Sequence, residues 1–248
     1  MTIIRVDTLA STNDYLKELA HRQVLEEGTV VATRNQTEGK GQRGNSWESE
    51  AGMNITCSIL LYPSFLPLQR YFLLSEAVSL GVKQTLDAYT GGFTIKWPND
   101  IYHNDRKIAG ILIENELTGN AYSLSVVGIG VNILQEHFRS DALRPVSLKQ
   151  ITGRDYDLDV LLEELALSVV WNYEQLKTGG AEDIIRRYHE ALYRRSGLHR
   201  YEDSEGAFLA RIDRVSDDGL LHLVTDQEEE RTYAFKSVRF VDLSDRGV

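Results

Sequence analysis

The segment from Lys107 to Ile113 constrains the fold more than any other part of this 248-residue chain. It reads Lys-Ile-Ala-Gly-Ile-Leu-Ile, so apolar residues stand at odd and even positions alike. In an extended strand, alternation places Lys107 on one face with Ala109 and Ile111, and places Gly110 on the opposite face. Because both faces are apolar, the sequence predicts a central strand that is buried on both sides.

The rest of the chain supplies further strands and several helices. Apolar and β-branched runs predict strands over residues 2–6, 29–34, 53–61, 93–97, 107–114 and 122–131. Helical spacing predicts helices over residues 12–25, 68–89, 158–177 and 182–194. The first helix has N-cap chemistry in Ser11 to Asp14. The polar, glycine-bearing segment 35–52 is predicted to be a long loop.

After Gly197 the pattern changes to short β segments, over residues 208–215, 220–224, 231–235 and 238–241. Asp217-Asp218-Gly219 between the first two is typical of a hairpin turn. We therefore predict an α+β fold with a boundary near residue 196. Residues 1–195 would form the main domain, and residues 196–248 a small β-barrel.

Composition limits the classes of partner. Lys and Arg number 27 and Asp and Glu number 37, which gives a formal net charge of −10. A surface this acidic repels nucleic acid and anionic membranes, although a local basic pocket stays compatible with it. The single cysteine, Cys57, cannot form an internal disulfide. Together with the lack of a secretory signal and of a membrane-length apolar run, this predicts a cytoplasmic protein.

A glycine-rich loop carries two basic residues. It reads Gly39-Lys40-Gly41-Gln42-Arg43-Gly44, and Trp47 follows. Glycines allow a backbone to approach an anion closely, and clustered amides with nearby cations form a phosphate cradle. The spacing matches neither the Walker pattern nor a dinucleotide fingerprint. By itself the loop is equally compatible with a flexible surface loop.

Three further motifs are each ambiguous when taken alone. Lys96-Trp97-Pro98-Asn99-Asp100 either presents Asn99 and Asp100 at a strand end or is a plain turn. Lys107 either reaches solvent or points into a pocket. Gly110, and the two glycines of Gly128-Ile129-Gly130-Val131-Asn132, indicate a ligand or a backbone packed against bare strands. The Asn132 amide suits the hydrogen-bonding edge of adenine, but it suits a turn equally well.

In combination and order, these motifs resemble the biotin protein ligase family. The resemblance runs from about residue 7 to residue 132 and is carried by the Ser-Thr-Asn before a helix, Gln36, the glycine-basic loop, Trp47, Lys-Trp-Pro-Asn-Asp, Asp-Arg-Lys-Ile-Ala-Gly-Ile-Leu and Gly-Ile-Gly-Val-Asn. It implies a catalytic domain with a mixed sheet flanked by helices, related to class II aminoacyl-tRNA synthetases. The tail resembles the family's small SH3-like domain in position and size. Some members carry an N-terminal helix-turn-helix, for which about a dozen residues before the signature leave no room.

The resemblance implies an ATP- and Mg²⁺-dependent enzyme that forms biotinyl-5′-AMP and transfers biotin to a lysine of a biotin carboxyl carrier domain. Lys107 would bridge the biotin carboxylate and the α-phosphate, and Asp100 would lie near the acceptor lysine. Ser11, Thr12 and Asn13 would meet the ureido ring, and Gln36 would bond near the carboxylate. The full implied biotin site is Ser11, Thr12, Asn13, Gln36, Gly39, Lys40, Gly41, Gln42, Lys107 and Gly110. The implied adenylate site is Lys40, Gln42, Arg43, Trp47, Asn99, Lys107 and Asn132, and no protein metal site is implied.

This chain departs from the family's Gly-Arg-Gly-Arg-x-Gly loop, since Lys40 and Gln42 stand at the arginine positions. A lysine keeps the charge but loses the bidentate fork, and Gln42 loses the charge. We hypothesise that biotinyl-5′-AMP dissociates faster from this protein than from family members whose loop carries both arginines. Two alternatives stay open: a lipoate or octanoate ligase or transferase of the same fold, and a non-catalytic biotin-sensing protein. A homodimer is also left open.

Overall fold

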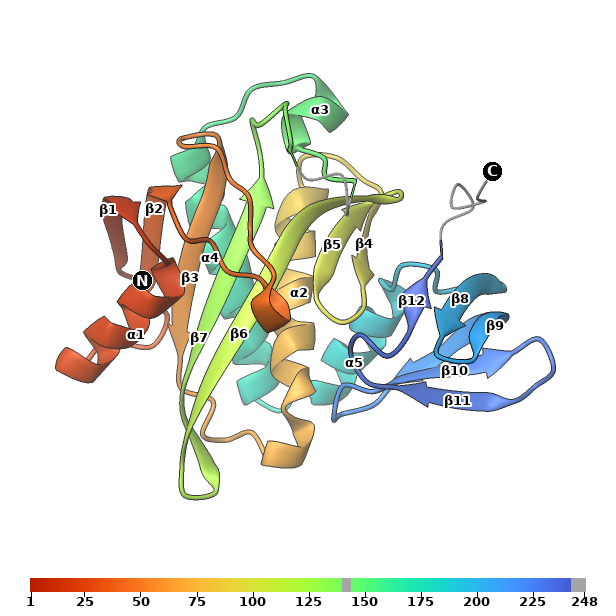
Figure 1. Ribbon diagram of the computed structural model, residues 1–248. Helices are drawn as coiled ribbons and strands as arrows, with labels where there is room; N and C mark the ends of the chain where they lie inside the picture. The colour runs from red at the N-terminus through yellow and green to blue at the C-terminus, as the bar shows by residue number, and fades with distance from the viewer. Residues whose placement is uncertain (140–143, 242–248) are drawn as a thin grey trace.

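The computed structural model describes residues 1–139 and 144–241, and a large sheet fills its centre (Figure 1). Its seven strands have the order β1-β2-β3-β7-β6-β5-β4. They are β1 (Ile3–Leu9), β2 (Val30–Gln36), β3 (Asn54–Leu61), β4 (Phe93–Lys96), β5 (Asp100–His103), β6 (Arg106–Thr118) and β7 (Ala121–Asn132). β1 and β2 pair in parallel, and the other neighbours are antiparallel, so the sheet is mixed as predicted.

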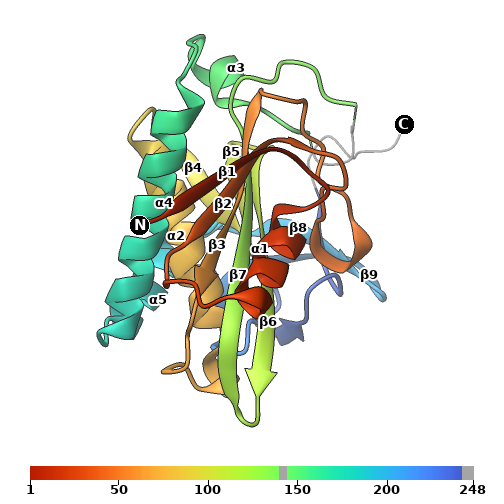
Figure 2. The same cartoon turned by 90° about the vertical axis from the view of Figure 1, so that its left-hand side faces the viewer.

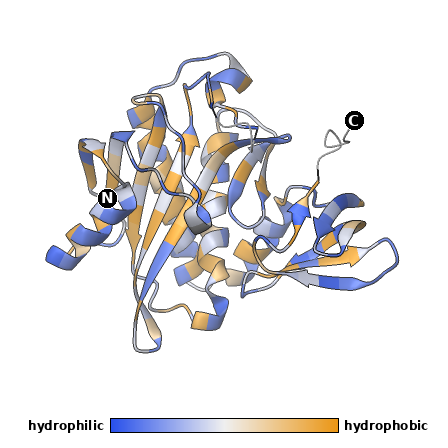
Figure 3. Ribbon diagram, viewed as in Figure 1, coloured by the Kyte–Doolittle hydropathy of each residue, from blue (hydrophilic) through white to orange (hydrophobic). Residues whose placement is uncertain are grey.

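The two faces of the sheet are covered differently. Helices α2 (Phe72–Asp87), α4 (Leu158–Lys177) and α5 (Ala181–Glu190) lie on one face, and α1 (Thr12–Arg22) lies on the other (Figures 1 and 2). α2 and α4 approach closely, because a Cβ on Gly81 would stand 2.6 Å from the Cα of Val169. Hydrophobic colour follows the central strands and the helices behind them (Figure 3). The main core therefore lies between the sheet and the three helices.

The predicted central strand is confirmed, with one difference. β6 lies inside the sheet, and Ile108, Ala109 and Ile111 are buried on the core side. Gly110 and Leu112, on the opposite side, are only half-buried. That side of β6 faces a cavity rather than a packed layer, so apolar residues on both faces do not mean burial on both faces here.

The C-terminal residues form a second sheet, antiparallel throughout, with the order β11-β10-β9-β8-β12. Its strands are β8 (His199–Asp203), β9 (Gly206–Val215), β10 (Leu221–Thr225), β11 (Glu230–Tyr233) and β12 (Arg239–Phe240). The predicted fold class, α+β with a small SH3-like β unit at the C-terminus, is confirmed. The division into residues 1–195 and 196–248 stays a prediction, and residues 242–248 lie outside the described chain.

Several short elements were not predicted. β5, β8 and the helix α3 (Leu148–Thr152) are between four and five residues long, and β8 reads His-Arg-Tyr-Glu-Asp, without an apolar alternation. The predicted helix 68–89 divides into the 3-10 helix η2 (Leu68–Arg70) and α2. Loop 35–52 contains the 3-10 helix η1 (Gln42–Gly44). Short elements held by tertiary contacts leave little periodic signal in a sequence.

The hairpin turn of the second sheet docks on η2, α2 and the end of β4. The backbone N–H of Phe72 donates to the Asp217 carbonyl, and the Arg70 guanidinium lies 2.5 Å from the Asp217 carboxylate. The indole N–H of Trp97 donates to the Gly219 carbonyl at 3.0 Å. The Asp-Asp-Gly turn that the sequence predicts therefore has a second role, because it fixes the two sheets against each other.

A buried carboxyl group lies beside this junction. Glu76 of α2 is 1% exposed, and its Oε2 has no hydrogen-bond partner among the described residues. Burial, together with the nearby Asp217 carboxylate, raises the pKa of Glu76 to about 8, although Arg70 opposes the shift. The folded protein therefore favours the protonated acid.

We predict that Glu76→Gln stabilises the protein at alkaline pH. Because the pKa is raised on folding, the contribution of Glu76 to stability is fully present below its ordinary pKa of 4.5 and is lost as the pH rises through about 8. Gln keeps the neutral shape and does not ionise. Urea unfolding should show the variant to be more stable by about 2 kcal/mol or more at pH 8, with little difference at pH 5. The exposed Glu230→Gln is the control, and parallel curves for Glu76→Gln and the wild type would contradict the prediction.

Candidate functional site

One transverse row of residues crosses the large sheet from β4 to β3. Strand register pairs Lys96 with Asp100, Asp100 with Gly110, Gly110 with Gly130, and Gly130 with Thr56. Residues paired directly across strands share a face, so these side chains stand on one side of the sheet. All five residues line the same cavity. The row therefore forms part of the floor of the candidate site, with two bare glycines in its middle.

Lys107 reaches this floor through an irregularity in the pairing. β5 and β6 pair Ile101 with Ala109 but Tyr102 with Lys107, so Ile108 is an extra residue on β6. A β-bulge of this kind turns the following side chains over. Lys107 Nζ lies 2.7 Å from the Asp100 carboxylate. A Cβ on Gly110 would lie 3.3 Å from the same Nζ atom. The prediction that Lys107 shares the face of Ala109 and Ile111 is wrong, because strict alternation does not hold here.

The cavity has a volume of about 850 Å³ and brings most of the predicted site residues together. Those that line it are Ser11, Thr12, Asn13, Gln36, Lys40, Gly41, Gln42, Trp47, Asn99, Asp100, Lys107 and Gly110. Gly39 and Asn132 are not part of the lining, and the Arg43 side chain lies outside the part of the chain that the structure describes. Residues far apart in sequence meet here: Asn13 Nδ2 donates to the Leu112 carbonyl, 99 positions along the chain.

A buried polar network forms one end of the cavity. Ser11 caps α1 by accepting from the Asp14 backbone N–H, as predicted, so α1 begins with Thr12 and Asn13 against the sheet. The Ser58 hydroxyl of β3 lies 2.7 Å from the Thr12 hydroxyl and 2.6 Å from Asn13 Oδ1. Thr12, Asn13 and Ser58 are at most 3% exposed. This end can recognise a compact polar group, because its donors and acceptors are held in fixed positions.

The side chains around Asn13 fix its amide. Asn13 Nδ2 donates to the Glu114 carboxylate at 2.7 Å, and a Cβ on Gly128 would stand 2.4 Å from Asn13 Oδ1. Gly128 is therefore bare because Asn13 packs against it. Ser58 and Glu114 do not line the cavity but hold Asn13 in place, and the sequence did not predict this role for either.

Gln36 lies at the same end. Its Oε1 accepts from the Thr12 backbone N–H at 2.8 Å and from the Thr12 hydroxyl at 3.2 Å. The structure thus places Gln36 beside the residue that the resemblance assigns to the ureido ring. Its assigned role near the carboxylate stays a prediction.

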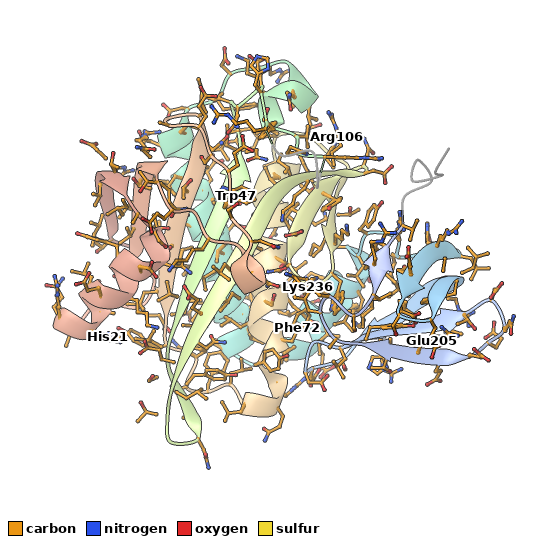
Figure 4. All side chains as sticks on the ribbon, in the orientation of Figure 1. His21, Trp47, Phe72, Arg106, Glu205 and Lys236 are labelled. Carbon is orange, nitrogen blue, oxygen red and sulfur yellow. The ribbon has the colours of Figure 1, made fainter. Side chains whose placement is uncertain are left out.

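The glycine-basic loop folds over the sheet and places Trp47 on its floor. The backbone N–H of Trp47 donates to the Gly39 carbonyl, and a Cβ on Gly39 would lie 2.4 Å from the Trp47 carbonyl oxygen. A Cβ on Gly130 would stand 2.3 Å from the indole ring, and one on Gly110 would stand 3.0 Å from it. Something does pack against these bare strands, but it is the side chain of Trp47 (labelled in Figure 4) rather than the ligand or backbone that the sequence indicated.

The charged groups of the site are paired within the protein. Lys40 Nζ lies 2.8 and 2.5 Å from the two oxygens of the Asp14 carboxylate, and this pair is about half exposed. Lys107 Nζ lies 5.7 Å from the centre of a Trp47 ring and contacts Asp100. Both lysines therefore already hold an anion, and an anionic ligand can replace it.

The two asparagines have distinct surroundings. Asn99 Nδ2 donates to the Ile111 carbonyl and lies at the turn between β4 and β5. Asn132 Nδ2 donates to the Val146 carbonyl at 3.3 Å, whereas its buried Oδ1 has no partner among the described residues. The unpaired oxygen is buried, and Asn132 is not part of the cavity lining. The predicted contact of Asn132 with adenine stays a prediction.

The model of the biotin/lipoate A/B protein ligase family matches residues 6–132. The chain belongs to this family. Among curated proteins, a bifunctional ligase/repressor BirA of Bacillus spizizenii is 30% identical, over 94% of this chain and 72% of that protein. A biotin–[acetyl-CoA-carboxylase] ligase of Paracoccus denitrificans is 31% identical, over 78% and 82% of the two chains. The predicted resemblance to biotin protein ligases, and the prediction of a ligase, are confirmed.

Solved structures of family members have the same fold. A biotin protein ligase from Aquifex aeolicus, in complex with biotin and ATP, superposes with a TM-score of 0.79 at 24% identity, over 97% and 99% of the two chains. At 24% identity, this similarity establishes a shared fold and nothing further. No helix in the described ranges is long and apolar enough to cross a membrane.

We predict that Gly130→Ala displaces Trp47 from the floor of the site. The added methyl would stand 2.3 Å from the indole, so the ring must move. Fluorescence of Trp47, recorded in a background with Trp97→Phe and Trp171→Phe, should shift to longer wavelength as the ring becomes hydrated. Gly91→Ala is the matched control, since a Cβ there meets nothing within 4 Å. An unchanged emission maximum for Gly130→Ala would contradict this placement of Trp47.

Proposed function

We propose that this chain uses ATP to convert biotin into biotinyl-5′-AMP and then transfers the biotinyl group to a lysine of a biotin carboxyl carrier domain. The observation that supports it most strongly is the position of Lys107. Its ammonium stands beside Asp100 and the bare Gly110–Gly130 pair, in one cavity with Thr12 and Asn13, whose polar groups Ser58 holds from behind the lining. That cavity offers a cation for reacting anions next to a polar end for a ureido ring.

The first step joins two anions. A carboxylate oxygen of biotin attacks the α-phosphorus, the bond to the bridging oxygen of the β-phosphate breaks, and pyrophosphate leaves. Negative charge builds up on the α-phosphoryl oxygens. A fixed ammonium stabilises this charge more in the transition state than in the separated reactants. Lys107 carries out this role in the proposal, and the site supports it because the lysine is held in place by Asp100 and lies beside Trp47.

The second step transfers the acyl group. The neutral amine of the acceptor lysine attacks the acyl carbon, AMP leaves with its phosphate oxygen, and the amine loses a proton. Asp100 lines the cavity next to Lys107, so its carboxylate can orient the amine and accept the proton. Asp100 would be released for this task once the adenylate has drawn Lys107 away.

Mg²⁺ enters this proposal as part of the substrate, bound to the ATP phosphates. The described residues contain no group of three or more His, Cys, Asp or Glu side chains that could hold a metal ion. We place the reaction in the cytoplasm, where carboxylase carrier domains and ATP are present. The buried, unpaired Cys57 is consistent with a reducing compartment.

The family model also includes lipoate ligases, so the choice of biotin needs its own support. Biotin differs from lipoate in having a ureido ring with two N–H donors and a carbonyl acceptor. A site with fixed, buried polar groups rejects a ligand that leaves them unpaired. The network of Thr12, Asn13 and Ser58 supplies such groups, and it favours biotin over lipoate.

We predict that wild-type protein given ATP, Mg²⁺ and biotin retains biotinyl-adenylate, visible by native mass spectrometry. Lys107→Ala should lower the rate of adenylate formation by about 100- to 1000-fold and still bind biotin. Arg211→Gln, an exposed ion-paired arginine of the second sheet, is the control. Lipoyl-adenylate in place of biotinyl-adenylate would move the assignment to the lipoate branch. Biotin bound without any adenylate would indicate a sensing protein.

We also predict that Gln42→Arg slows release of the adenylate. Gln42 lines the cavity within η1, at a position where the family resemblance implies an arginine, and a second fixed cation should hold the phosphate more tightly. Stopped-flow dissociation of biotinyl-adenylate should be about 10-fold slower in the variant, as expected for one charge-assisted hydrogen bond. The variant Gln42→Leu separates charge from size, because it should release the ligand no more slowly than the wild type.

A further inference from the structure

A carboxylate stands at the start of a hydrogen-bond chain that ends in the cavity. Glu114 of β6 accepts from Asn13 Nδ2 at 2.7 Å. The Ser58 hydroxyl lies 2.6 Å from Asn13 Oδ1 and 2.7 Å from the Thr12 hydroxyl. Thr12 and Asn13 line the cavity, whereas Glu114 and Ser58 lie outside the lining. The chain therefore leads from a charge behind the cavity wall to a hydroxyl group inside it.

Glu114 fixes the orientation of the Asn13 amide. An ionised carboxylate can only accept hydrogen bonds, so the amide nitrogen must face it. The same nitrogen lies 3.4 Å from the Leu112 carbonyl oxygen, which is a second acceptor. A reversed amide would bring its own oxygen against both of these oxygens. Asn13 Oδ1 therefore points toward Ser58, into space that is open because residue 128 is glycine, where a Cβ would stand 2.4 Å from Oδ1.

This orientation sets the direction of the remaining hydrogen bonds. Asn13 Oδ1 can only accept, so Ser58 donates its single hydroxyl proton to Asn13. The 2.7 Å contact between the Ser58 and Thr12 oxygens then requires the hydroxyl proton of Thr12. The 3.2 Å contact of the Thr12 hydroxyl with Gln36 Oε1 uses the same proton. In either case, the Thr12 hydroxyl has only lone pairs left for a ligand.

Without the charge at position 114, this direction would be free to reverse. If the Asn13 amide turned over, its nitrogen would donate to Ser58, and Ser58 would donate to Thr12. The Thr12 proton would then be available to a ligand. Thr12, Asn13 and Ser58 are at most 3% exposed, so solvent has little access to compensate for a wrong direction. One carboxylate therefore decides whether this end of the cavity accepts or donates.

We propose that Glu114 is a positioning residue that makes this end of the cavity an acceptor and so selects a ligand ring that presents an N–H group to Thr12. The proposal rests on the proposed use of biotin, whose ureido ring carries two N–H groups. Glu114 acts on the ligand through Asn13 and Ser58, since it is not part of the lining. A ring without an N–H group, such as the dithiolane of lipoate, would leave the Thr12 oxygen unpaired.

The first test is Glu114→Gln, which keeps the size of the side chain but can donate as well as accept. Calorimetric titration with biotin alone should give a Kd about 10-fold weaker than that of the wild type. The KM for biotin should rise by the same factor, while kcat and the KM for ATP stay within about 2-fold, because Glu114 touches no reacting group. Glu116→Gln is the matched control, since Glu116 lies on the same strand but pairs with Lys17 and His21.

A double variant exchanges the carboxylate and the amide between the two positions. In Asn13→Asp combined with Glu114→Gln, the carboxylate at position 13 accepts both from Ser58 and from the amide at position 114. Ser58 therefore keeps its direction, and the Kd for biotin should return to within about 3-fold of the wild type. Asn13→Asp alone places two carboxylates in contact and should bind biotin most weakly. A role of Glu114 in packing alone would instead give losses that add in the double variant.

The second probe is a pair of cyclic carbamate analogues of biotin, in which a ring oxygen replaces one or the other ureido N–H. One of the two analogues places an acceptor against the Thr12 oxygen. The wild type should bind that analogue about 10-fold or more weakly than the other. Glu114→Gln should reduce this difference, because Thr12 is then able to donate.

Two results would overturn the role of Glu114: equal biotin affinity in the wild type and in Glu114→Gln, or additive losses in the double variant. Biotin bound by a wild type that forms no adenylate would contradict the proposed function alone, and the titrations would still decide the role of Glu114. A wild type without affinity for biotin would overturn both.

Discussion

The antiparallel pairing of Gly110 with Gly130 leaves two adjacent strands without side chains at the centre of one sheet face. Any other residue at Gly130 would put a Cβ into the space of the Trp47 indole. The glycine-basic loop can fold down onto the sheet because this floor is bare. The same bare surface brings Lys107, Asp100 and Trp47 within reach of one ligand. A side chain in either strand would separate the two ends of the cavity.

Around this floor, positive and negative charges are distributed unevenly. The overall surface is acidic, whereas the cavity collects lysine and arginine side chains and places two of them beside carboxylates. An internal carboxylate holds each of these lysines in position until a phosphate or carboxylate of the ligand takes its place. Such pairs keep the cations at fixed places, so less reorganisation accompanies the reaction.

The junction between the sheets connects the second sheet to this chemistry. The Asp217–Gly219 turn bonds to Arg70, Phe72 and Trp97, and Trp97 belongs to the motif that carries Lys96, Asn99 and Asp100. A shift of the small sheet would therefore move the end of β4 and the turn that follows it. The buried acid Glu76, whose pKa is raised by burial and by the Asp217 carboxylate, lies beside this contact.

The sequence predicted much of the fold, and most of the residues it assigned to a site line the cavity. Long segments with helical periodicity were predicted correctly: residues 158–177, for example, form the predicted helix with the predicted ends. The glycine-basic loop, the strand around Lys107 and the paired glycines were also visible, because glycine and isolated charge are unusual within apolar runs. Ser58 and Glu114, which hold Asn13, were missed, because their contacts are with a residue that is distant in sequence.

What the sequence by itself determined was the set of elements and the chemical types available to the site: a central strand, bare glycines, and lysines in an acidic chain. Only the tertiary structure decided the face on which Lys107 stands. The extra residue Ile108 shifts the β5–β6 register and turns Lys107 toward Asp100. A bulge depends on the pairing between two strands, so it cannot be recognised from the residue alternation within a single strand. The face on which Lys107 stands could therefore be assigned only once its pairing with β5 was known.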